Sequence, residues 1–349
     1  MLENELRKDY LLNRWVIIAK NRKKRPTDFI KKESIINEST CPLCPNNEQM
    51  TPPAVLVYLP SNGKPKKKKD ENEFRHKNWL VRVIPNLYPA FTPPTNQDIS
   101  NIDNTIPLKA VGHHEVVVES PCHTEHPSFA RVSQLVHVIN AYLDRLNVLS
   151  KKAYVKHVTI FRNHGQQAGA SLSHPHTQII ASPIIPTIVE NEIELSKKYW
   201  NTNHECVFCD ILQQEAEGSR FIYENQSFVV FAPYASINPL EFWIFPKSHN
   251  SSILFLSENQ ISDLAKTMRI CFGALRTLLN DPPYNFGFHT VTNEHAKNFY
   301  HWHLEVYPRL ATWAGFEKST CMFINTVSPE DAAIELRSAV QGEQKALRN

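Results

Sequence analysis

The chain has 349 residues, of which 42% are hydrophobic and 21% charged, and its formal net charge is +3. This length allows two domains or one large duplicated domain, and so small a charge does not indicate nucleic-acid binding. Neither common Gly-rich nucleotide loop, G-x-G-x-x-G or G-x-x-x-x-G-K-[ST], is present. The sequence also lacks a run of about 20 apolar residues and an apolar signal core after Met1. We therefore expect a cytoplasmic protein that neither spans a membrane nor binds nucleic acid.

The first half of the chain predicts two strands, a helix and two more strands. Strand-like runs cover residues 79–84 and 113–120. Apolar residues three or four apart then predict an amphipathic helix, with Val132, Leu135, Val136, Ile139, Leu143 and Leu146 along its stripe. A strand over 157–163 and another holding two histidines complete a β-β-α-β-β unit.

The second half repeats this order of elements. Strand-like runs at 228–232 and 241–249 precede a second amphipathic helix, whose stripe is Ile261, Leu264, Met268, Cys271, Leu275 and Leu278. Ser257 and Gln260 form a capping-box pattern at its start. We predict an α+β fold of two duplicated units, with largely antiparallel sheets and helices packed on one face. A boundary near 190–203 gives domains 1–195 and 196–349.

One pattern of cysteines and histidines occurs in each half. The first copy is Cys41, Cys44, His123 and His174, and the second is Cys206, Cys209, His249 and His301. The step from the lone histidine to the paired ones is 51 residues in the first copy and 52 in the second. Cysteine and histidine suit tetrahedral zinc, and four protein ligands make a closed, structural site. A single C-x-x-C also occurs in surface turns and redox pairs, but the repetition favours two metal sites.

The ligand set of the second site is less defined than that of the first. Glu192, His289 and His303 are further candidate ligands in the pattern. Other histidines have no counterpart in the repeat, so we interpret them as ordinary polar residues; they include His76, His137 and His204.

His176 is the candidate reacting group. Positions 174, 176 and 178 share one face of a strand, so His176 and Gln178 project beside a metal-bound His174. A neutral imidazole can attack phosphorus through one nitrogen while the other nitrogen fixes the tautomer. Gln178 can donate to a phosphoryl oxygen but cannot act as a general acid. This favours exchange between phosphates over hydrolysis. The alternative is a buried strand histidine bonded to a backbone carbonyl.

Three other segments carry candidate phosphate-binding groups. Small residues at 168–171 allow a phosphate close to the backbone, and Ser171 is a potential donor to it. Arg22 and Arg25 have the spacing of a phosphate clamp, with a basic surface turn as the equal alternative. The lysine-rich stretch 62–78 is predicted to be a solvated loop, with a phosphate-binding arm as its alternative.

These motifs together resemble the galactose-1-phosphate uridylyltransferase family, a branch of the histidine-triad superfamily. The resemblance covers nearly the whole chain and includes the start at residues 14–18, both C-x-x-C pairs, H-P-H-T-Q at 174–178 and Gly315-Phe316-Glu317. It implies duplicated histidine-triad-like units and a nucleophile, His176, that forms a nucleotidyl-histidine. By the same resemblance the substrate-binding residues are Arg22, Arg25, Asn86, Asn163, Ser171, Gln178 and Glu317. It also implies a homodimer with the site near the subunit interface, and zinc at both metal sites, with iron as an alternative at the second.

The resemblance implies a ping-pong exchange between a nucleotide sugar and a sugar 1-phosphate, of the type UDP-glucose plus galactose 1-phosphate. In having two C-x-x-C pairs, the chain also resembles plant-type ADP-glucose phosphorylases. A phosphorylase of ADP-glucose or of a dinucleoside polyphosphate is therefore the alternative. A zinc-stabilised nucleic-acid-binding protein is a more distant one. The segment 318–321 and Phe323 depart from the pattern of well-studied uridylyltransferases. These departures leave the sugar and the acceptor open.

Overall fold

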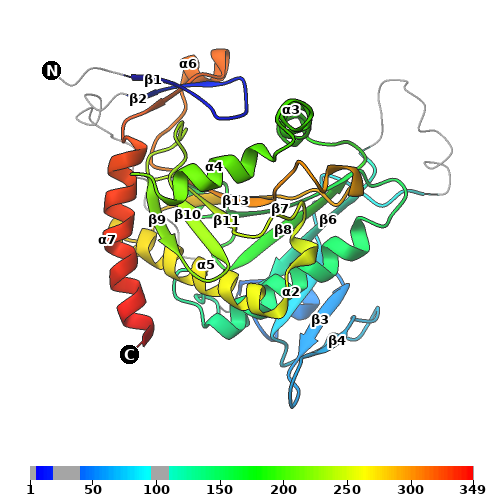
Figure 1. Ribbon diagram of the computed structural model, residues 1–349. Coiled ribbons are helices and arrows are strands. Elements are labelled where there is room, and N and C mark those ends of the chain that lie inside the picture. The colour runs from blue at the N-terminus through cyan, green and yellow to red at the C-terminus, as the bar shows by residue number, and fades with distance from the viewer. Residues whose placement is uncertain (1–4, 19–39, 96–109, 349) are drawn as a thin grey trace.

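The computed structural model describes residues 5–18, 40–95 and 110–348 (Figure 1). Its centre is an 11-stranded sheet in the order β4-β3-β5-β6-β8-β7-β12-β13-β11-β10-β9. These strands are β3 (Leu56–Leu59), β4 (Lys66–Lys68), β5 (Val81–Pro85), β6 (His113–Val118), β7 (His157–His164), β8 (His176–Ser182), β9 (Phe221–Glu224), β10 (Phe228–Phe231), β11 (Phe242–Pro246), β12 (Tyr284–His289) and β13 (His303–Pro308). Every pair of neighbouring strands in this sheet is antiparallel.

The two halves of the chain repeat each other within this sheet. From the centre outward, the first half runs β7-β8-β6-β5 and the second runs β12-β13-β11-β10. The helices α2 (Val132–Leu149) and α5 (Glu258–Leu279) occupy the same place in the two units. The halves meet where β7 pairs with β12. The α+β class and the repeated β-β-α-β-β order are thus confirmed. The division into domains 1–195 and 196–349 stays a prediction.

Alternating side chains of the strands bury the sheet on both faces in the second half. Phe228 and Val230 of β10 belong to the core under α2 and α5, whereas Val229 and Phe231 pack against two other helices. These are α3 (Thr187–Asn203) and α4 (Val207–Ala216), which lie across the sheet from α5 in Figure 1. The sequence predicted helices on one face of the sheet only. In the structure α3 and α4 cover the opposite face as well. Each buried phenylalanine contributes about 1.5–3 kcal/mol of apolar transfer energy.

A smaller sheet lies beside the large one. It consists of β1 (Glu5–Lys8), β2 (Trp15–Ile18) and β14 (Phe323–Asn325), with β14 parallel to β2. Val16 and Ile18 pack there against Ala235 and Ile237. The helices next to this sheet are α6 (Gly315–Thr320) and α7 (Pro329–Arg348) (Figure 1). Short 3-10 helices are η3 (Glu48–Met50), η4 (Gln166–Ala168), η5 (Ile253–Phe255) and η6 (Glu294–Ala296).

The start of α5 follows the sequence pattern. The Ser257 hydroxyl accepts from the Gln260 backbone N–H, and the Gln260 side chain accepts from the Ser257 N–H. This capping box satisfies two N–H groups that the first helical turn leaves without partners. The predicted helix start is confirmed.

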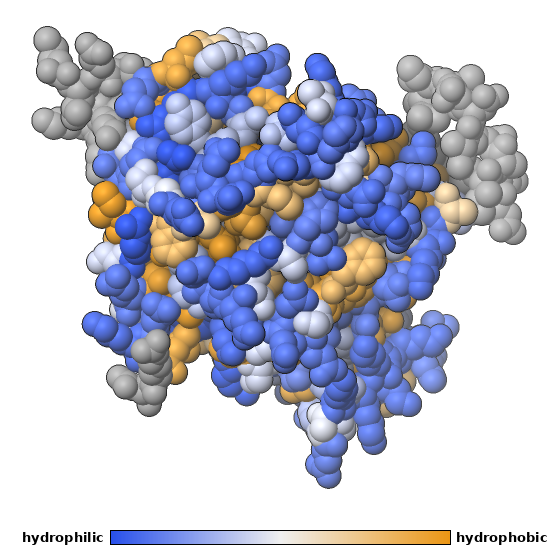
Figure 2. Space-filling view, viewed as in Figure 1, coloured by the Kyte–Doolittle hydropathy of each residue, from blue (hydrophilic) through white to orange (hydrophobic). Residues whose placement is uncertain are grey.

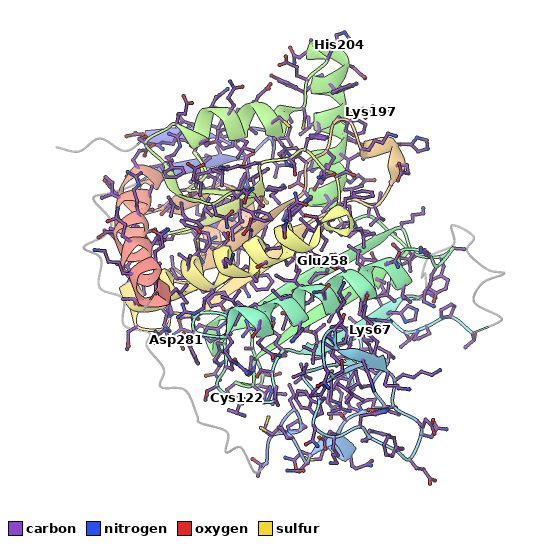
Figure 3. The ribbon with its side chains drawn as sticks, turned by 60° about the horizontal axis from the view of Figure 1, so that its bottom comes forward. Lys67, Cys122, Lys197, His204, Glu258 and Asp281 are labelled. Atoms are coloured by element: carbon purple, nitrogen blue, oxygen red, sulfur yellow. The ribbon has the colours of Figure 1, made fainter. Side chains whose placement is uncertain are left out.

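The lysine-rich segment differs from the predicted solvated loop. Lys66–Lys68 form the edge strand β4, which pairs with β3. Lys67 (labelled in Figure 3) forms an ion pair of 2.6 Å with Asp144 of α2. Asp70 is buried and binds Arg82 at 2.8 Å. The sequence did not reveal this because the paired strand and the ion-pair partners lie elsewhere in the chain. Lysines on an edge strand also oppose pairing with other chains.

The face of the molecule shown in Figure 2 carries mostly polar groups. On the face shown in Figure 2, hydrophilic side chains cover most of the molecule and apolar atoms show mainly between the helices. None of the helices in the described ranges combines the length and the apolar character that a membrane crossing requires.

His157 makes the fold sensitive to acid. It begins β7 with 6% exposure, and within the described residues its Nε2 atom has no hydrogen-bond partner. Burial and the neighbouring His289 charge lower the pKa of His157 to about 4. In the unfolded chain the pKa is about 6.5, so the unfolded state binds a proton first as the pH falls. The stability associated with this group is therefore complete above pH 6.5 and is lost between about pH 6.5 and 4.

We expect His157→Phe to remove this loss. From pH 7 to pH 4.5, the free energy of unfolding of the variant should rise relative to wild type by about 2–3 kcal/mol. Denaturant titrations at the two pH values measure this difference. The exposed His295→Gln variant is the control and should stay parallel to wild type. Parallel pH profiles for His157→Phe and wild type would contradict the assignment.

Candidate active site and metal groups

Four donor side chains converge at the first metal group. Cys41, Cys44, His123 and His174 each offer one donor atom, and these atoms lie within 4.8 Å of one another. The Cys44 Sγ atom is 3.1 Å from His123 Nδ1 and 3.4 Å from His174 Nδ1. Tetrahedral zinc places sulfur and nitrogen ligands about 3.5 Å apart. The structure thus brings together all four residues of the predicted first site, and the donor set fits zinc.

The two histidines of this group present the nitrogens that a metal needs. His174 Nε2 lies 2.8 Å from the Ser120 carbonyl oxygen and therefore donates to it. His123 Nε2 lies 3.0 Å from Ser173 Oγ. Burial lowers the pKa of His174 to about 4, so this ring is neutral at pH 7. Fixing Nε2 as the protonated nitrogen leaves Nδ1 of His174 available as a ligand.

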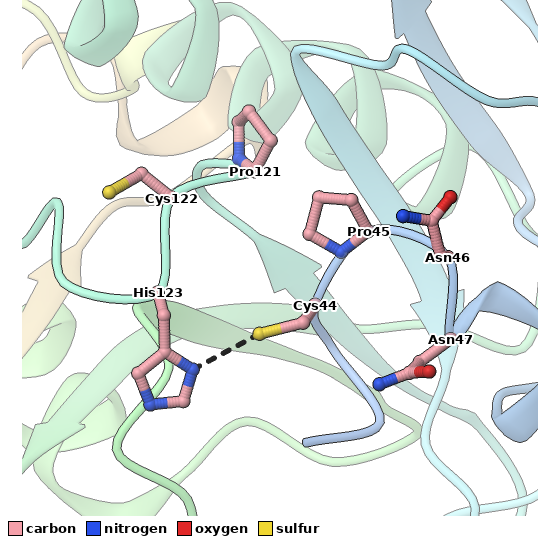
Figure 4. A pocket seen from close by; sticks show the side chains of 7 residues that line it. All are labelled: Cys44, Pro45, Asn46, Asn47, Pro121, Cys122 and His123. Atoms are coloured by element: carbon pink, nitrogen blue, oxygen red, sulfur yellow. Dashed lines mark hydrogen bonds between the residues drawn. The ribbon is translucent and has the colours of Figure 1, made fainter. Parts of the chain in front are cut away.

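A surface pocket of about 500 Å³ opens beside this metal group (Figure 4). It is lined by Cys44, Pro45, Asn46, Asn47, Pro121, Cys122 and His123. The lining includes two candidate ligands but neither His176 nor Gln178. This pocket therefore lies at the loops that carry the candidate metal ligands and not at His176.

The second metal group shows three of its four predicted residues as a compact cluster. The donor atoms of Cys206, Cys209 and His249 lie within 4.8 Å of one another. His301 is adjacent, with Nδ1 3.5 Å from Cys209 Sγ. Hydrogen bonds from Cys209 and His249 lower the pKa of Cys206 to about 5, which favours a thiolate there. The donor set again suits zinc. The place of His301 as the fourth ligand stays a prediction.

The extra ligand candidates of the second half form a separate group. Glu192, His289 and His303 cluster with Glu305, which the sequence analysis missed. His289 Nδ1 lies 2.9 Å from a Glu192 oxygen, and His303 Nε2 lies 3.2 Å from Glu305 Oε1. Although burial opposes it, the charges of both carboxylates raise the pKa of His289 to about 9. A protonated His289 offsets one of the two carboxylate charges, and the four donor atoms also lie within 4.8 Å of one another, as at a metal site.

His176 has the geometry of a nucleophile. It begins β8 and is 7% exposed. Its Nδ1 atom lies 2.8 Å from the His174 carbonyl oxygen, so Nδ1 carries the hydrogen and donates. The lone pair is then on Nε2. Burial lowers the pKa of His176, which keeps the ring neutral at physiological pH. A purely structural histidine, buried in a strand and bonded to a backbone carbonyl, would make this same hydrogen bond. The bond also leaves the lone pair of Nε2 available for attack.

A buried ion pair supports the backbone on both sides of His176. Arg162 on β7 pairs with Glu119, and Arg162 Nη1 also donates to the His176 carbonyl oxygen at 3.2 Å. Glu119 accepts from the hydroxyls of Thr177 and Tyr142. Arg162 and Glu119 are only 1% and 2% exposed. Sequence reasoning missed this pair because a single charge in an apolar strand does not identify its partner.

Breaking this pair is expected to destabilise the protein strongly. Glu119→Gln leaves the buried Arg162 charge without a counter-ion, which costs about 3–5 kcal/mol. Denaturant unfolding measures this loss. The double variant Glu119→Gln, Arg162→Met should recover part of it because no buried charge remains. Arg131→Ala is the control, since that ion pair has a side chain 67% exposed and should contribute less than about 1 kcal/mol. Equal effects in Glu119→Gln and Arg131→Ala would contradict the role of the buried pair.

The predicted phosphate-binding residues of the first half lie on β8, on β7 and in the loop before β8. Gln178 lies on β8 two residues after His176, and Asn163 lies on the neighbouring β7. Asn163 Oδ1 accepts from Asn285 Nδ2 at 2.8 Å, and Asn285 pairs with Asn163 across β7 and β12. Asn285 was missed because it meets Asn163 only when β12 pairs with β7. Ser171 is exposed in the loop before β8.

The loop before Ser171 has the backbone shape that its glycine allows. Gly169 has a φ of +88°, and a Cβ atom there would lie 3.7 Å from Asn163 Nδ2. Glycine adopts this left-handed conformation without steric cost. The loop therefore lies beside the Asn163 amide, and phosphate binding by this loop stays a prediction.

One predicted substrate-binding residue, Glu317, lies apart from His176 within one chain. Glu317 lies in α6, where it accepts from the Ala314 N–H at 2.9 Å. Helix α6 sits beside the small sheet, apart from β8 (Figure 1). Arg22 and Arg25 lie outside the described residues. Asn86 follows β5 and its side chain reaches His114 on β6, close to Gln178.

Comparisons with known proteins identify relatives over almost the full length. A family model described as galactose-1-phosphate uridyl transferase, N-terminal domain, matches residues 2–186, and a domain of unknown function (DUF4921) matches 122–348. ADP-glucose phosphorylase of Arabidopsis thaliana is 35% identical over 95% of this chain and 92% of that protein. Galactose-1-phosphate uridylyltransferase of Thermotoga maritima is 30% identical over 95% of this chain and 98% of that protein.

A solved structure shows the same architecture. The crystal structure of an ADP-glucose phosphorylase from Arabidopsis thaliana with bound ADP-glucose superimposes with a TM-score of 0.81 and 32% identity. The match covers 96% of this chain and 99% of that one. The chain therefore belongs to the galactose-1-phosphate uridylyltransferase family, which here includes ADP-glucose phosphorylase, and it is a nucleotidyltransferase.

Proposed function

We propose that this enzyme moves a nucleoside monophosphate from a nucleotide sugar to a sugar 1-phosphate through a covalent His176 intermediate. The observation that carries the proposal is the fixed tautomer of His176, whose Nδ1–H donates to the His174 carbonyl. In the first step Nε2 attacks the α-phosphorus, the P–O bond to the sugar phosphate breaks, and sugar 1-phosphate leaves. In the second step a phosphate oxygen of the acceptor attacks the same phosphorus and the P–N bond breaks.

The surrounding residues act on the charge of the phosphoryl group. In this proposal Gln178, Ser171 and Asn163 supply polar hydrogens to the phosphoryl oxygens and stabilise their charge. No proton has to reach the leaving group, because a sugar phosphate is stable as an anion. We assign zinc to the two groups that contain cysteine pairs, where a closed ligand set holds loops and takes no part in the reaction.

A second copy of the chain would complete the site. Glu317 lies in α6 and His176 in β8, and these elements lie apart in Figure 1, so a site that uses both residues would need another subunit. A homodimer with the site near the interface satisfies this requirement. None of the seven cysteines, all within the described ranges, forms a disulfide. This is typical of a reducing compartment and supports a cytoplasmic location.

Phosphorolysis of ADP-glucose is the second candidate. It is favoured by the two cysteine-pair groups and by the 35% identity to ADP-glucose phosphorylase. In that reaction inorganic phosphate replaces sugar 1-phosphate in the second step, and the covalent step is unchanged. The two candidates therefore differ in donor and acceptor only.

A two-by-two assay separates them. The enzyme is incubated with UDP-glucose or ADP-glucose, each combined with galactose 1-phosphate or with phosphate. Formation of UDP-galactose with the first acceptor supports the leading proposal. Formation of ADP with phosphate supports the phosphorylase instead. The absence of any nucleotide exchange with all four pairs, using folded, metal-loaded protein, would overturn both.

A further inference from the structure

The amide of Gln178 makes one hydrogen bond whose direction is defined by the structure. Its Oε1 atom lies 2.8 Å from Nε2 of His114. His114 lies on β6, which pairs with β8 so that Val116 faces Gln178 and His114 faces Ile180. Side chains two apart on a strand share a face, so His114 and Gln178 project from the same side of the sheet.

The tautomer of His114 follows from its other nitrogen. The Ala90 backbone N–H donates to His114 Nδ1 at 3.1 Å. A nitrogen that accepts a hydrogen bond carries no hydrogen, so in the neutral ring Nε2 is the protonated nitrogen. Nε2–H then donates to Gln178 Oε1. Asn86 Nδ2 lies 3.2 Å from the same Nε2, where both nitrogens carry hydrogens, so this contact adds no hydrogen bond.

We propose that His114 is a positioning residue that sets which end of the Gln178 amide faces the transferred phosphoryl group. With Oε1 held by His114, the NH₂ group is the end that remains to donate to a phosphoryl oxygen. If the amide turned over, its carbonyl oxygen would face the negative phosphoryl oxygens and would repel them. This inference rests on the proposed function and deepens it by naming a residue that the family resemblance did not supply.

The same ring also holds a loop on the other side. The loop after β5 carries Asn86, whose N–H donates to the His114 carbonyl oxygen at 2.8 Å. Asn86 Oδ1 accepts from the Tyr88 N–H at 2.9 Å, and Ala90 donates to Nδ1 of the ring. The two nitrogens of His114 thus have different roles. Nδ1 accepts a hydrogen bond from the candidate nucleoside-binding loop, and Nε2 orients Gln178.

Two substitutions separate the role of Nδ1 from the role of Nε2. In His114→Asn the amide reaches the position of Nδ1, so Oδ1 can still accept from Ala90 while the bond to Gln178 is lost. In His114→Gln the amide reaches the position of Nε2, so Nε2 can still donate to Gln178 while the loop contact is lost. We expect His114→Asn to lower the rate constant of nucleotidylation by about 10- to 100-fold with little change in donor KM. His114→Gln should keep a rate constant close to that of wild type and raise KM.

A double-mutant cycle then tests whether His114 acts through Gln178. His114→Asn should slow the wild-type enzyme but should not slow Gln178→Ala further, because the amide it orients is absent. His113→Asn is the matched control on the same strand, where His113 Nε2 bonds the Tyr154 hydroxyl at 2.7 Å and not Gln178. This control should react at the wild-type rate.

The failure of this inference can be told apart from the failure of the proposed function. If wild type forms the covalent label and Gln178→Ala is slow, but the effects of His114→Asn and Gln178→Ala multiply, His114 does not act through Gln178. A His114→Gln variant as slow as His114→Asn would also overturn the inference. If the wild type forms no label at all, the proposed function itself is wrong.

Discussion

Replacing His176 with alanine is expected to lower turnover by at least about 10⁴-fold, because the reaction loses the atom that carries the nucleoside monophosphate. Neighbouring residues can still bind the donor, so substrate affinity should change far less than the rate. Initial-rate measurements with saturating donor and acceptor give the turnover number, and equilibrium binding of the donor gives the affinity. A variant that keeps more than about 1% of wild-type turnover would require a direct, single-step transfer.

The corresponding residue of the second half provides the matched control. His303 stands in the repeat where His176 stands in the first half, and its Nδ1 atom lies 3.1 Å from the His301 carbonyl oxygen. Its Nε2 atom, however, lies 3.2 Å from the Glu305 carboxylate. A nitrogen held by a carboxylate is not free to attack phosphorus. We therefore expect His303→Gln, checked for intact folding, to form the covalent intermediate at a rate close to that of wild type.

Loss of the first metal group should reduce stability before it affects the chemistry. Cys44→Ser replaces a thiolate ligand, so the protein should lose one equivalent of metal. A ligand that binds only the folded state stabilises it by about 4 kcal/mol at 1,000 times its dissociation constant. We expect a loss of about this size in the free energy of unfolding, measured by denaturant titration together with metal content.

Cys122→Ser is the control for this substitution. Cys122 is exposed and adjacent to the ligand His123, but it lies outside the group of four donors (Figure 4). It should retain the metal and the wild-type stability. If Cys44→Ser lost its metal and its activity yet unfolded like wild type, the metal would have a catalytic role and the structural assignment would be wrong.

Local patterns in the sequence were sufficient to predict the two repeated units of the fold. The helical stripes and the doubled ligand spacing predicted the two β-β-α-β-β units, and the pair Ser257 and Gln260 predicted the start of α5. These features depend on residues close together in the chain or on a repeat. The repeat also predicted that Cys41, Cys44, His123 and His174 form one group, because the second copy has nearly the same spacing.

The contacts that organise the site were not predictable in the same way. Arg162 with Glu119, and His114 with Gln178, join strands that become neighbours only after the sheet forms. Single charged or polar residues within apolar strands do not identify such partners. The edge strand β4 was missed for the same reason, since a run of lysines is usually solvated and only its pairing with β3 shows the strand.

The second half shows how a repeated unit changed its role. Its cysteine pair keeps the metal-binding pattern, whereas Glu305 and Glu192 bind the histidines that follow in the repeat. The carboxylate of Glu305 stands two residues after His303, where the first half has Gln178 two residues after His176. A negative group at that position would repel a phosphoryl oxygen. The difference between Gln178 and Glu305 thus supports the proposal that the chemistry takes place in the first half.

The central claim is that the nucleoside monophosphate is attached to His176 during the reaction. The direct test is to incubate folded, metal-loaded enzyme with UDP-glucose or ADP-glucose, radiolabelled in the α-phosphate, without any acceptor, and to map the label by peptide mass analysis. We predict an acid-labile, base-stable label on the peptide that contains His176, with release of sugar 1-phosphate. No label above that of His176→Ala, or a label on a different residue, would contradict the claim.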